Sequence, residues 1–151
     1  VMTNTLHHIP QPRLFFAEAC RCLRPGGVVS MIEPWVTTFS RLVYHYIHHE
    51  PFTPNSPSWE FPSTGPLSGA NQALPWMVFS RDRTAFENEF PDIHVRTICP
   101  DMPFVYLLSG GLTAPSFLPA AGYGLYRKVE DICSPLMDRI ALFAHIVLEK
   151  R

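Results

Sequence analysis

The sequence lacks the marks of a membrane-spanning, exported or nucleic-acid-binding protein. No apolar run approaches the roughly 20 residues that a membrane-spanning helix needs, and the opening residues carry no basic side chain of the kind that begins a signal peptide. The 12 lysines and arginines are scattered and the net charge is −1, so no basic patch favours nucleic-acid binding. These absences predict a cytoplasmic protein whose partners include neither a membrane nor a nucleic acid.

The cysteines also lack a pattern. The chain has 4 of them, and no pair has the spacing of a zinc site or of a disulfide framework. Cys20 and Cys22 fall on opposite sides of an expected helix, so they do not form one metal site. We therefore expect free thiols, which are typical of a reducing compartment.

The composition predicts one folded domain. Hydrophobic residues make up 46% of the 151 residues and charged residues 17%, which favours a packed core. The chain has 16 prolines, concentrated between Pro51 and Pro119, so we expect a middle region rich in loops. Because the chain starts at Val1 rather than at a methionine, we expect it to be a piece of a longer protein, unless Met2 is the true start after a tag residue.

Residues 12–35 carry the clearest structural pattern. A helix is predicted by four apolar side chains at helical spacing: Phe16, Ala19, Cys20 and Leu23. Leu-Arg-Pro-Gly-Gly at residues 23–27 ends this helix in a tight turn. The apolar run at residues 28–32 then predicts a strand covered on both faces. Glu33 follows at the carboxyl end of that strand, where open α/β sheets bind ligands.

The rest of the chain predicts further helices and strands around this unit. We expect helices at residues 36–49, 84–90 and 125–137, and strands at residues 93–99 and 140–148. A proline-rich excursion separates the first two of these helices. The mixture of helices with apolar strands predicts an α/β fold.

Taken in order, these pieces resemble the C-terminal half of a class I S-adenosylmethionine-dependent methyltransferase, in a branch that acts on small molecules. The resemblance is strongest at residues 4–35, which include Leu-His-His-Ile-Pro at residues 6–10 and the glycine turn. Pro-Trp-Met-Val-Phe at residues 75–79 and the closing residues 143–150 also resemble that branch. The fold that this resemblance implies is a doubly wound, Rossmann-like sheet whose last strand is antiparallel.

The chain departs from the family at its cofactor site. The family grips S-adenosylmethionine with a glycine-rich loop after its first strand and an acidic residue after its second, and this chain has neither. The resemblance therefore implies a single truncated domain, residues 1–151, that lacks its N-terminal βα units. Residues 35–75 and 102–135 are then insertions that form the acceptor side. We expect that this chain alone does not bind the cofactor, and that its exposed sheet edge favours a homo-oligomer such as a dimer.

The resemblance also implies roles for the residues that follow the family's fourth strand. Asn4, Thr5 and Leu6 would line the methionine side of the cofactor. His7 and His8 would lie near the methyl donor, where either is a candidate base, because histidine titrates near neutrality.

Two further candidates follow the strand predicted at residues 28–32. Glu33 is a candidate ligand contact or base, or it caps the next helix or pairs with a cation such as Arg41. Trp35 is a candidate wall of the acceptor pocket, or else a core residue.

Three histidines recur near the end of the helix expected at residues 36–49. His45, His48 and His49 share one face of that helix, with Glu50 beside them. This cluster has three interpretations: it lines the acceptor pocket, it is a solvated helix end, or it forms a metal site if a carboxylate joins the histidines. Because methyltransferases of this class usually need no metal, we expect no resident metal ion.

An apolar lid or partner surface is a further possibility after the strand predicted at residues 93–99, with burial against the sheet as its alternative. The residues that predict it are Tyr106, Leu107, Leu108, Leu112, Phe117 and Leu118.

The sequence leaves three functions open. The first is the C-terminal part of an S-adenosylmethionine-dependent methyltransferase that transfers a methyl group to a small-molecule acceptor. The second is a non-catalytic, truncated α/β interaction module that oligomerises. The third is a metal-dependent hydrolase that uses His45, His48 and His49.

Overall fold

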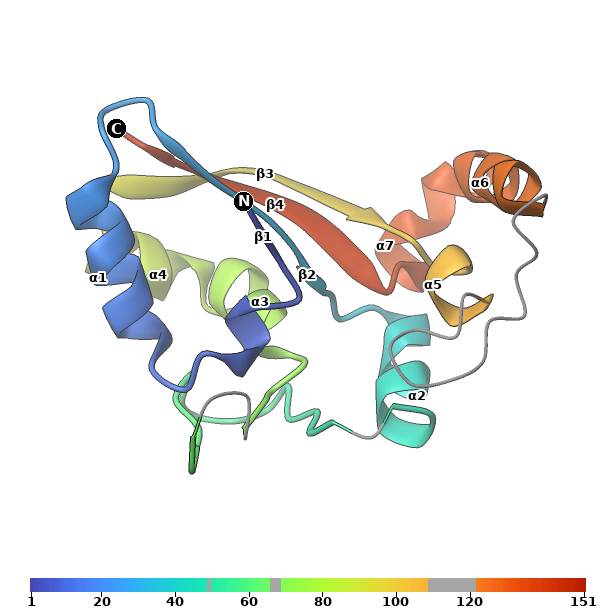
Figure 1. The fold of residues 1–151 in the computed structure, drawn as a ribbon, viewed down its shortest axis with the longest axis horizontal. Coiled ribbons are helices and arrows are strands. Elements are labelled where there is room, and N and C mark those ends of the chain that lie inside the picture. Colours follow the sequence, from blue (N-terminus) through green and yellow to red (C-terminus); the bar gives the residue numbers. More distant parts are fainter. Residues whose placement is uncertain (49, 66–68, 109–121) are drawn as a thin grey trace.

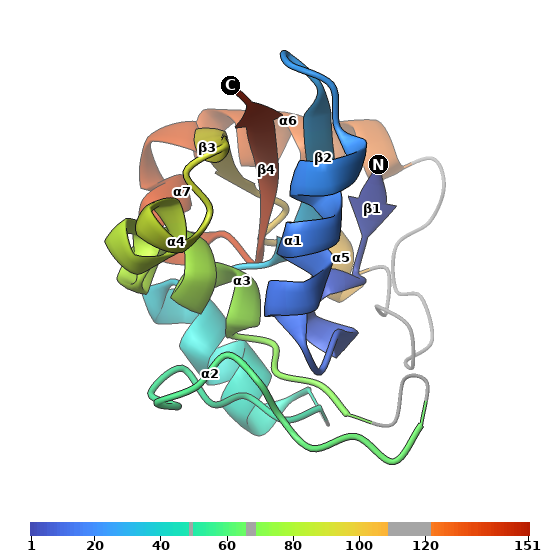
Figure 2. The same ribbon diagram turned by 90° about the vertical axis from the view of Figure 1, so that its left-hand side faces the viewer.

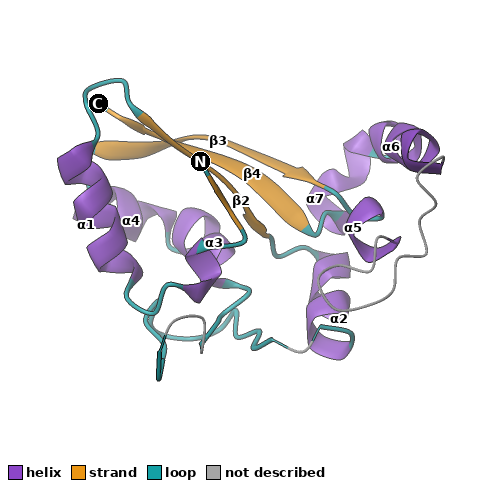
Figure 3. Cartoon of the chain, in the orientation of Figure 1, coloured by secondary structure: helices purple, strands orange, loops and turns teal. Residues whose placement is uncertain are grey.

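A computed structural model describes residues 1–48, 50–65, 69–108 and 122–151, and shows an α/β fold built on a mixed four-stranded sheet (Figures 1 and 3). The strands are β1 (Met2–Thr3), β2 (Val28–Pro34), β3 (Ile93–Asp101) and β4 (Phe143–Lys150), in the order β1-β2-β4-β3. β1 and β2 are parallel, whereas β4 runs antiparallel to both of its neighbours. The α/β class and the antiparallel last strand are therefore confirmed.

One face of the sheet is covered by helices. These are α1 (Pro12–Cys22), α3 (Leu74–Trp76), η2 (Met77–Arg81) and α4 (Arg83–Glu89) (Figures 1 and 2). Their aromatic side chains pack edge to face around Phe16, whose ring centroid lies 5.0 Å from that of Phe86 and 5.7 Å from that of Phe79. Met31, Ile146 and Leu148 are fully buried against this cluster from the sheet. Burial of these side chains is the main force that holds the helices to the sheet.

The turn between α1 and β2 forms as the glycine pattern predicts. Gly26 has a φ of +76°, which favours glycine. A Cβ atom on Gly27 would lie 2.8 Å from the carbonyl oxygen of Arg24, so a larger residue would displace the turn. Lys150 closes the same corner: its Nζ atom donates to the carbonyl oxygen of Cys20 in α1 and to that of Leu23, the residue that caps α1.

A second group of helices lies beyond the end of β2 and the start of β4 (Figure 1). It contains α2 (Thr38–Tyr46), α5 (Val105–Leu108), α6 (Tyr123–Ile132), η4 (Ser134–Leu136) and α7 (Met137–Ile140). A capping box between Thr37 and Ser40 starts α2, and the Thr37 hydroxyl also donates to the carbonyl oxygen of Ala141 at 2.9 Å. These contacts fix α2 beside the carboxyl end of β2.

Several sequence-based expectations differ from the structure. The strand expected to be covered on both faces is not, because α1, α3 and α4 all lie on one side of it. On the other face Val28 is 46% exposed, and the exposed pair Ser30 and His145 forms a hydrogen bond of 2.8 Å.

Element boundaries also differ. The helix expected at residues 36–49 is α2, which begins after its Thr37 cap and ends at Tyr46. The helix expected at residues 125–137 is divided into α6, η4 and α7, because Pro135 lacks the amide hydrogen that a continuous helix needs. The strand expected at residues 140–148 is β4, which begins three residues later.

The cysteines and the helix lengths bear on two expectations drawn from composition. The four cysteines are free thiols, as predicted. None of the helices that the structure describes is long and apolar enough to cross a bilayer. The single, truncated domain over residues 1–151 stays a prediction.

Candidate functional site

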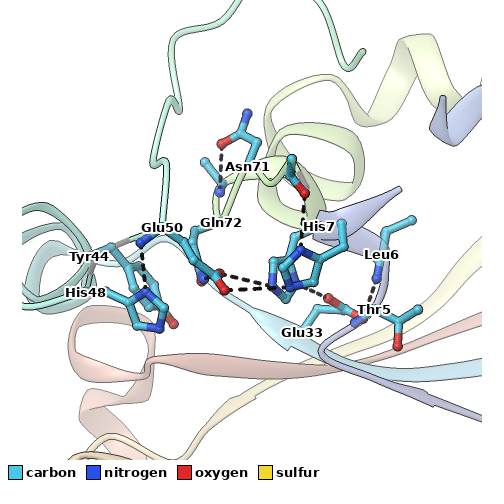
Figure 4. Close-up of polar contacts among 12 residues, drawn as sticks. Thr5, Leu6, His7, Glu33, Tyr44, His48, Glu50, Asn71 and Gln72 are labelled. Atoms are coloured by element: carbon cyan, nitrogen blue, oxygen red, sulfur yellow. Dashed lines mark hydrogen bonds and ion pairs between the residues drawn. The ribbon is translucent and has the colours of Figure 1, made fainter. Parts of the chain in front are cut away.

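The candidate site lies where the parallel strands β1 and β2 end side by side (Figure 4). After β1 the chain passes through Asn4, whose φ of +50° turns the backbone, and whose amide donates to the carbonyl oxygen of Ile32 at 2.9 Å. The short helix η1 (Leu6–His8) follows. Because the carboxyl ends of parallel strands meet at one edge, residues 4–8 lie against Glu33 at the end of β2.

Glu33 is fully buried and holds this edge together. Its Oε1 atom accepts hydrogen bonds from the backbone amides of Thr5 and Leu6, at 2.8 and 2.9 Å. Its Oε2 atom lies 2.8 Å from Nδ1 of His7. The carboxylate thus satisfies two amides of the η1 turn and one imidazole, which is how a buried charge is tolerated.

Glu33 neither caps α2 nor pairs with Arg41, the two alternatives to a role in the site. The cap of α2 is Thr37. The guanidinium of Arg41 lies over the ring of Trp76, 5.6 Å from the ring centroid.

His7 is oriented by Glu33. Its side chain is almost fully buried, and its backbone carbonyl accepts from the amide of Asn71 at 2.9 Å. Because an ionised carboxylate can only accept, the 2.8 Å contact requires a proton on Nδ1 of His7. In the neutral ring, Nε2 therefore carries the lone pair, and this atom lies 3.6 Å from Oε2 of Glu50.

His8 is oriented in the same way by a backbone carbonyl. Its Nδ1 atom lies 3.2 Å from the carbonyl oxygen of Gly69, and its Nε2 atom lies 3.8 Å from Oε1 of Glu50. The two imidazole rings are neighbours, with centroids 4.2 Å apart. The side-chain amide of Gln72 donates to the Glu50 carboxylate and fixes it from the other side.

These groups surround a small cavity of about 40 Å³. The Oδ1 atom of Asn4, a residue of the cavity wall, is buried and has no hydrogen-bond partner within the described part of the chain. The hydroxyl oxygen of Tyr106 lies 3.4 Å from Nε2 of His48. Burial, together with the nearby charge of Glu50, raises the pKa of Tyr106. The lining residues are Asn4, His7, His8, Pro34, His48, Glu50, Gln72, Tyr106 and Phe143.

The structure brings together only some of the candidate residues. Asn4, His7, His8 and His48 line the cavity, and Glu33 holds His7 from behind. Thr5 and Leu6 contribute their amides to Glu33; the Leu6 side chain is buried in the core, and the Thr5 hydroxyl turns back to the carbonyl oxygen of Thr3. Their roles toward a cofactor or an acceptor stay predictions.

The other candidates lie elsewhere. Trp35 is buried in the main core cluster. His45 is exposed on α2, where its ring packs against that of Tyr46. His49 lies outside the described residues, as do Leu112, Phe117 and Leu118 of the predicted lid, whereas Leu107 and Tyr106 pack against the buried side chains of Leu142 and Phe143.

Comparison with known proteins adds one finding. The first residues of the chain, 1–31, match a family model described as a methyltransferase domain. This segment is methyltransferase-like. It spans β1, η1, α1, the glycine turn and the first part of β2, so it supplies Asn4, His7 and His8 to the cavity. No significant match was found among curated proteins or among solved structures.

Glu50 and Gln72, two of the cavity residues beyond the methyltransferase-like segment, carry little signal in the sequence. Gln72 belongs to no motif, and Glu50 stands out only as a neighbour of the three histidines. Both belong to the proline-rich region, which has no periodic pattern. It reaches the site through single hydrogen bonds, such as that from the amide of Asn71 to the carbonyl oxygen of His7 at 2.9 Å.

Proposed function

We propose that this chain is the C-terminal part of an S-adenosylmethionine-dependent methyltransferase that acts on a small-molecule acceptor, and that its sheet is part of a Rossmann-like sheet. The observation that carries the proposal is the methyltransferase match at residues 1–31, the segment that supplies Asn4, His7 and His8 to the site. The parallel pair β1 and β2 and the antiparallel β4 agree with it.

The described residues fit one end of the cofactor. The buried Oδ1 atom of Asn4 has no partner among them, and an acceptor of this kind suits the ammonium group at the methionine end of S-adenosylmethionine. The amides of Thr5 and Leu6 are already taken by Glu33. A cavity of about 40 Å³ holds only one or two water-sized groups, so most of the cofactor's contacts belong to other residues.

The chemistry of this site follows from the orientation of His7. S-adenosylmethionine supplies an activated methyl group, so the protein's work is to align the acceptor and to remove its proton where it is a hydroxyl. His7 presents its Nε2 lone pair to the cavity because Glu33 holds the proton on Nδ1. We therefore assign His7 as the base and Glu33 as the residue that positions it, an arrangement that also stabilises the imidazolium once it forms.

The other two functions gain less support. A hydrolase built on His45, His48 and His49 loses its basis within the described residues, because His45 is exposed on α2 while His48 faces the cavity. A purely structural module does not explain why a buried carboxylate orients one imidazole toward a cavity.

The test is calorimetric titration of S-adenosylmethionine into the protein made from its complete reading frame. We expect one binding site, weakened about tenfold in Asn4→Gly because one hydrogen bond to a charged group is lost. Glycine keeps the positive φ accessible, so the backbone turn survives. The exposed Asn88→Gly on α4 is the control. The absence of binding at millimolar ligand would contradict the proposal and favour the interaction module.

Self-association belongs to the same proposal. β1 is a two-residue edge strand, and the sheet face that carries Ser30 and His145 is exposed in the described part of the chain. Because β1 pairs only with Met31 and Ile32, residues 28–30 of β2 present an unpaired edge on that side, which is a template for pairing with another chain. We expect the 151-residue chain to form a dimer; a monodisperse monomer by light scattering would argue against it.

A further inference from the structure

Three potential metal ligands converge beside the cavity. His7, His8 and Glu50 each present one ligand atom, and these atoms all lie within 4.8 Å of one another. The Nε2 atoms of His7 and His8 lie 3.6 and 3.8 Å from the two oxygens of Glu50. Figure 4 shows the imidazole of His7 turned toward this carboxylate. The two histidines come from η1, and Glu50 comes from the segment after α2.

The atoms behind these ligands are arranged as in metal sites. Metal-binding histidines usually donate their other ring N–H to a carboxylate or a backbone carbonyl, which fixes the tautomer and the ring orientation. His7 meets the Glu33 carboxylate through Nδ1, and His8 meets the carbonyl oxygen of Gly69. Both lone pairs therefore lie on Nε2, the atom that faces Glu50. Glu50 is held in turn by the amide of Gln72.

The spacing suits a small tetrahedral ion. Two ligands, each about 2.1 Å from a zinc ion, lie about 3.4 Å apart at the tetrahedral angle. The separations of 3.6 and 3.8 Å join the two histidines to different oxygens of Glu50, and one ligand atom from each residue lies within 4.8 Å of the others. Side-chain shifts therefore bring the three ligands to that spacing. Two imidazoles and one carboxylate favour Zn²⁺ or Co²⁺ over Mg²⁺ or Ca²⁺, which prefer oxygen ligands throughout.

A fourth ligand position is available on the cavity side. The cavity of about 40 Å³ is lined by all three groups, and it has room for a water molecule or for the hydroxyl of a bound compound. The unpartnered Oδ1 atom of Asn4 also belongs to its wall. Three protein ligands with one open position is the arrangement of catalytic rather than structural zinc sites.

We propose that His7, His8 and Glu50 bind one zinc-class divalent ion whose fourth position opens into the cavity. The site differs from the one considered at His45, His48 and His49, and from the expectation of no resident metal. It goes beyond the proposed methyl transfer and holds whether or not that transfer occurs. A bound ion uses the Nε2 lone pair that the base needs, so His7 serves either as ligand or as base. In the loaded state the ion itself favours deprotonation of a hydroxyl at the open position.

The experiment uses the untagged chain after removal of metals with a chelator. Zn²⁺ is titrated by calorimetry, and bound metal is counted by elemental analysis after gel filtration. We expect one equivalent of zinc, with affinity lowered at least about 100-fold in His8→Gln and in Glu50→Gln, because a lost ligand costs more than a lost hydrogen bond to a ligand. Co²⁺ should give the visible absorption of a tetrahedral site in the wild type and in neither variant.

A matched control comes from a similar pair elsewhere on the surface. His94 lies 3.9 Å from Glu149 through its Nε2 atom, without a second histidine, so His94→Gln should leave zinc binding unchanged. His8 and Glu50 are both partly exposed, so these variants should fold, which circular dichroism checks. If one of the two variants fails to fold, the other still tests the site. Zinc should raise the melting temperature of the wild type and leave that of the folded variant unchanged.

Two results would overturn the proposal. One is the absence of stoichiometric zinc in the wild type at 100-fold molar excess. The other is binding that survives both ligand variants but disappears when the free cysteines are alkylated. Because no S-adenosylmethionine is present, neither result bears on the methyl-transfer proposal, and a failure of cofactor binding does not bear on the metal site.

Discussion

Glu33 determines which nitrogen of His7 can act. Its Oε1 atom is committed to the amides of Thr5 and Leu6, so only Oε2 is left for the imidazole. Both proposals, base and metal ligand, require the lone pair on Nε2 of His7. They therefore depend on a residue that does not line the cavity.

Glu33→Gln should reverse this tautomer without removing the backbone contacts. The amide oxygen must stay on the two backbone donors, which places the NH₂ group against Nδ1 of His7. We expect His7 to carry its proton on Nε2, with zinc affinity about 10–100-fold lower. Imidazole ¹⁵N chemical shifts and zinc titration measure the two effects.

The control for this substitution is Glu149→Gln, beside His94 on the surface. It should change neither measurement. A His7 ring that keeps its proton on Nδ1 in Glu33→Gln would show that Glu33 does not set the tautomer.

At the scale of elements, α2 is fastened to the start of β4 by Tyr44. This side chain is 2% exposed, and its hydroxyl donates to the carbonyl oxygen of Leu142, which also accepts from the amide of Trp35. Because burial disfavours the phenolate, the pKa of Tyr44 is well above its usual value. The neutral phenol is thus favoured in the folded state.

Tyr44→Phe should lower the free energy of unfolding by about 1 kcal/mol at neutral pH, the usual net value of one hydrogen bond. A raised folded pKa contributes stability below the unfolded value, near pH 10, and that contribution is lost as the pH rises further. The wild type should therefore lose more stability than Tyr44→Phe above about pH 10. Urea unfolding at pH 7 and above pH 10 measures this.

Tyr46→Phe, at an exposed position on the same helix, is the matched control and should behave as the wild type at both pH values. Equal alkaline losses in Tyr44→Phe and the wild type would mean that Tyr44 ionises freely in the folded protein.

Asp82, between η2 and α4, binds the loop that carries Trp59. Its carboxylate accepts from the indole Nε1 of the buried Trp59 at 2.8 Å and pairs with Arg81. The hydrogen bond from Arg81, followed by that from Trp59, lowers the pKa of Asp82. This stability is present above the unfolded pKa, near 4, and is lost as the pH falls through the lower folded value.

Asp82→Ala should cost about 1–3 kcal/mol at pH 7, because the buried indole N–H loses its acceptor. It should also weaken the dependence of stability on pH below about 4. Denaturant unfolding at pH 7 and pH 3 checks both, with the exposed Asp131→Ala as control. An unchanged midpoint at pH 7 would show that the Trp59 contact contributes nothing.

Elements formed by local rules could be predicted from the sequence. The α1–turn–β2 unit follows from helical spacing, Pro25 and the two glycines, and the structure confirms it. The cluster at the ends of β1 and β2 could be predicted in part, because residues 4–8 and Glu33 follow successive parallel strands. The contributions of Glu50 and Gln72 could not, since long-range hydrogen bonds place them and no periodic pattern encodes such contacts.

At the scale of the whole molecule, the sheet connects two groups of helices, and the candidate site lies between them. α1, α3 and α4 cover one face and bury most of the apolar core. α2, with the residues after β3, packs on a second, smaller core around Val43, Leu142 and Phe143. His7 and His8 come from the side of the first core and Tyr106 from the second. The shape of the cavity therefore depends on how the two cores pack relative to each other.

A ¹H–¹⁵N NMR titration of the protein from its complete reading frame with S-adenosylhomocysteine tests whether the cofactor binds where β1 and β2 end. We expect the largest amide shifts at Asn4, Thr5, Leu6 and His7, because the amides of Thr5 and Leu6 report directly on Glu33. Shifts confined to distant elements such as α6, or no shifts at millimolar ligand, would contradict it.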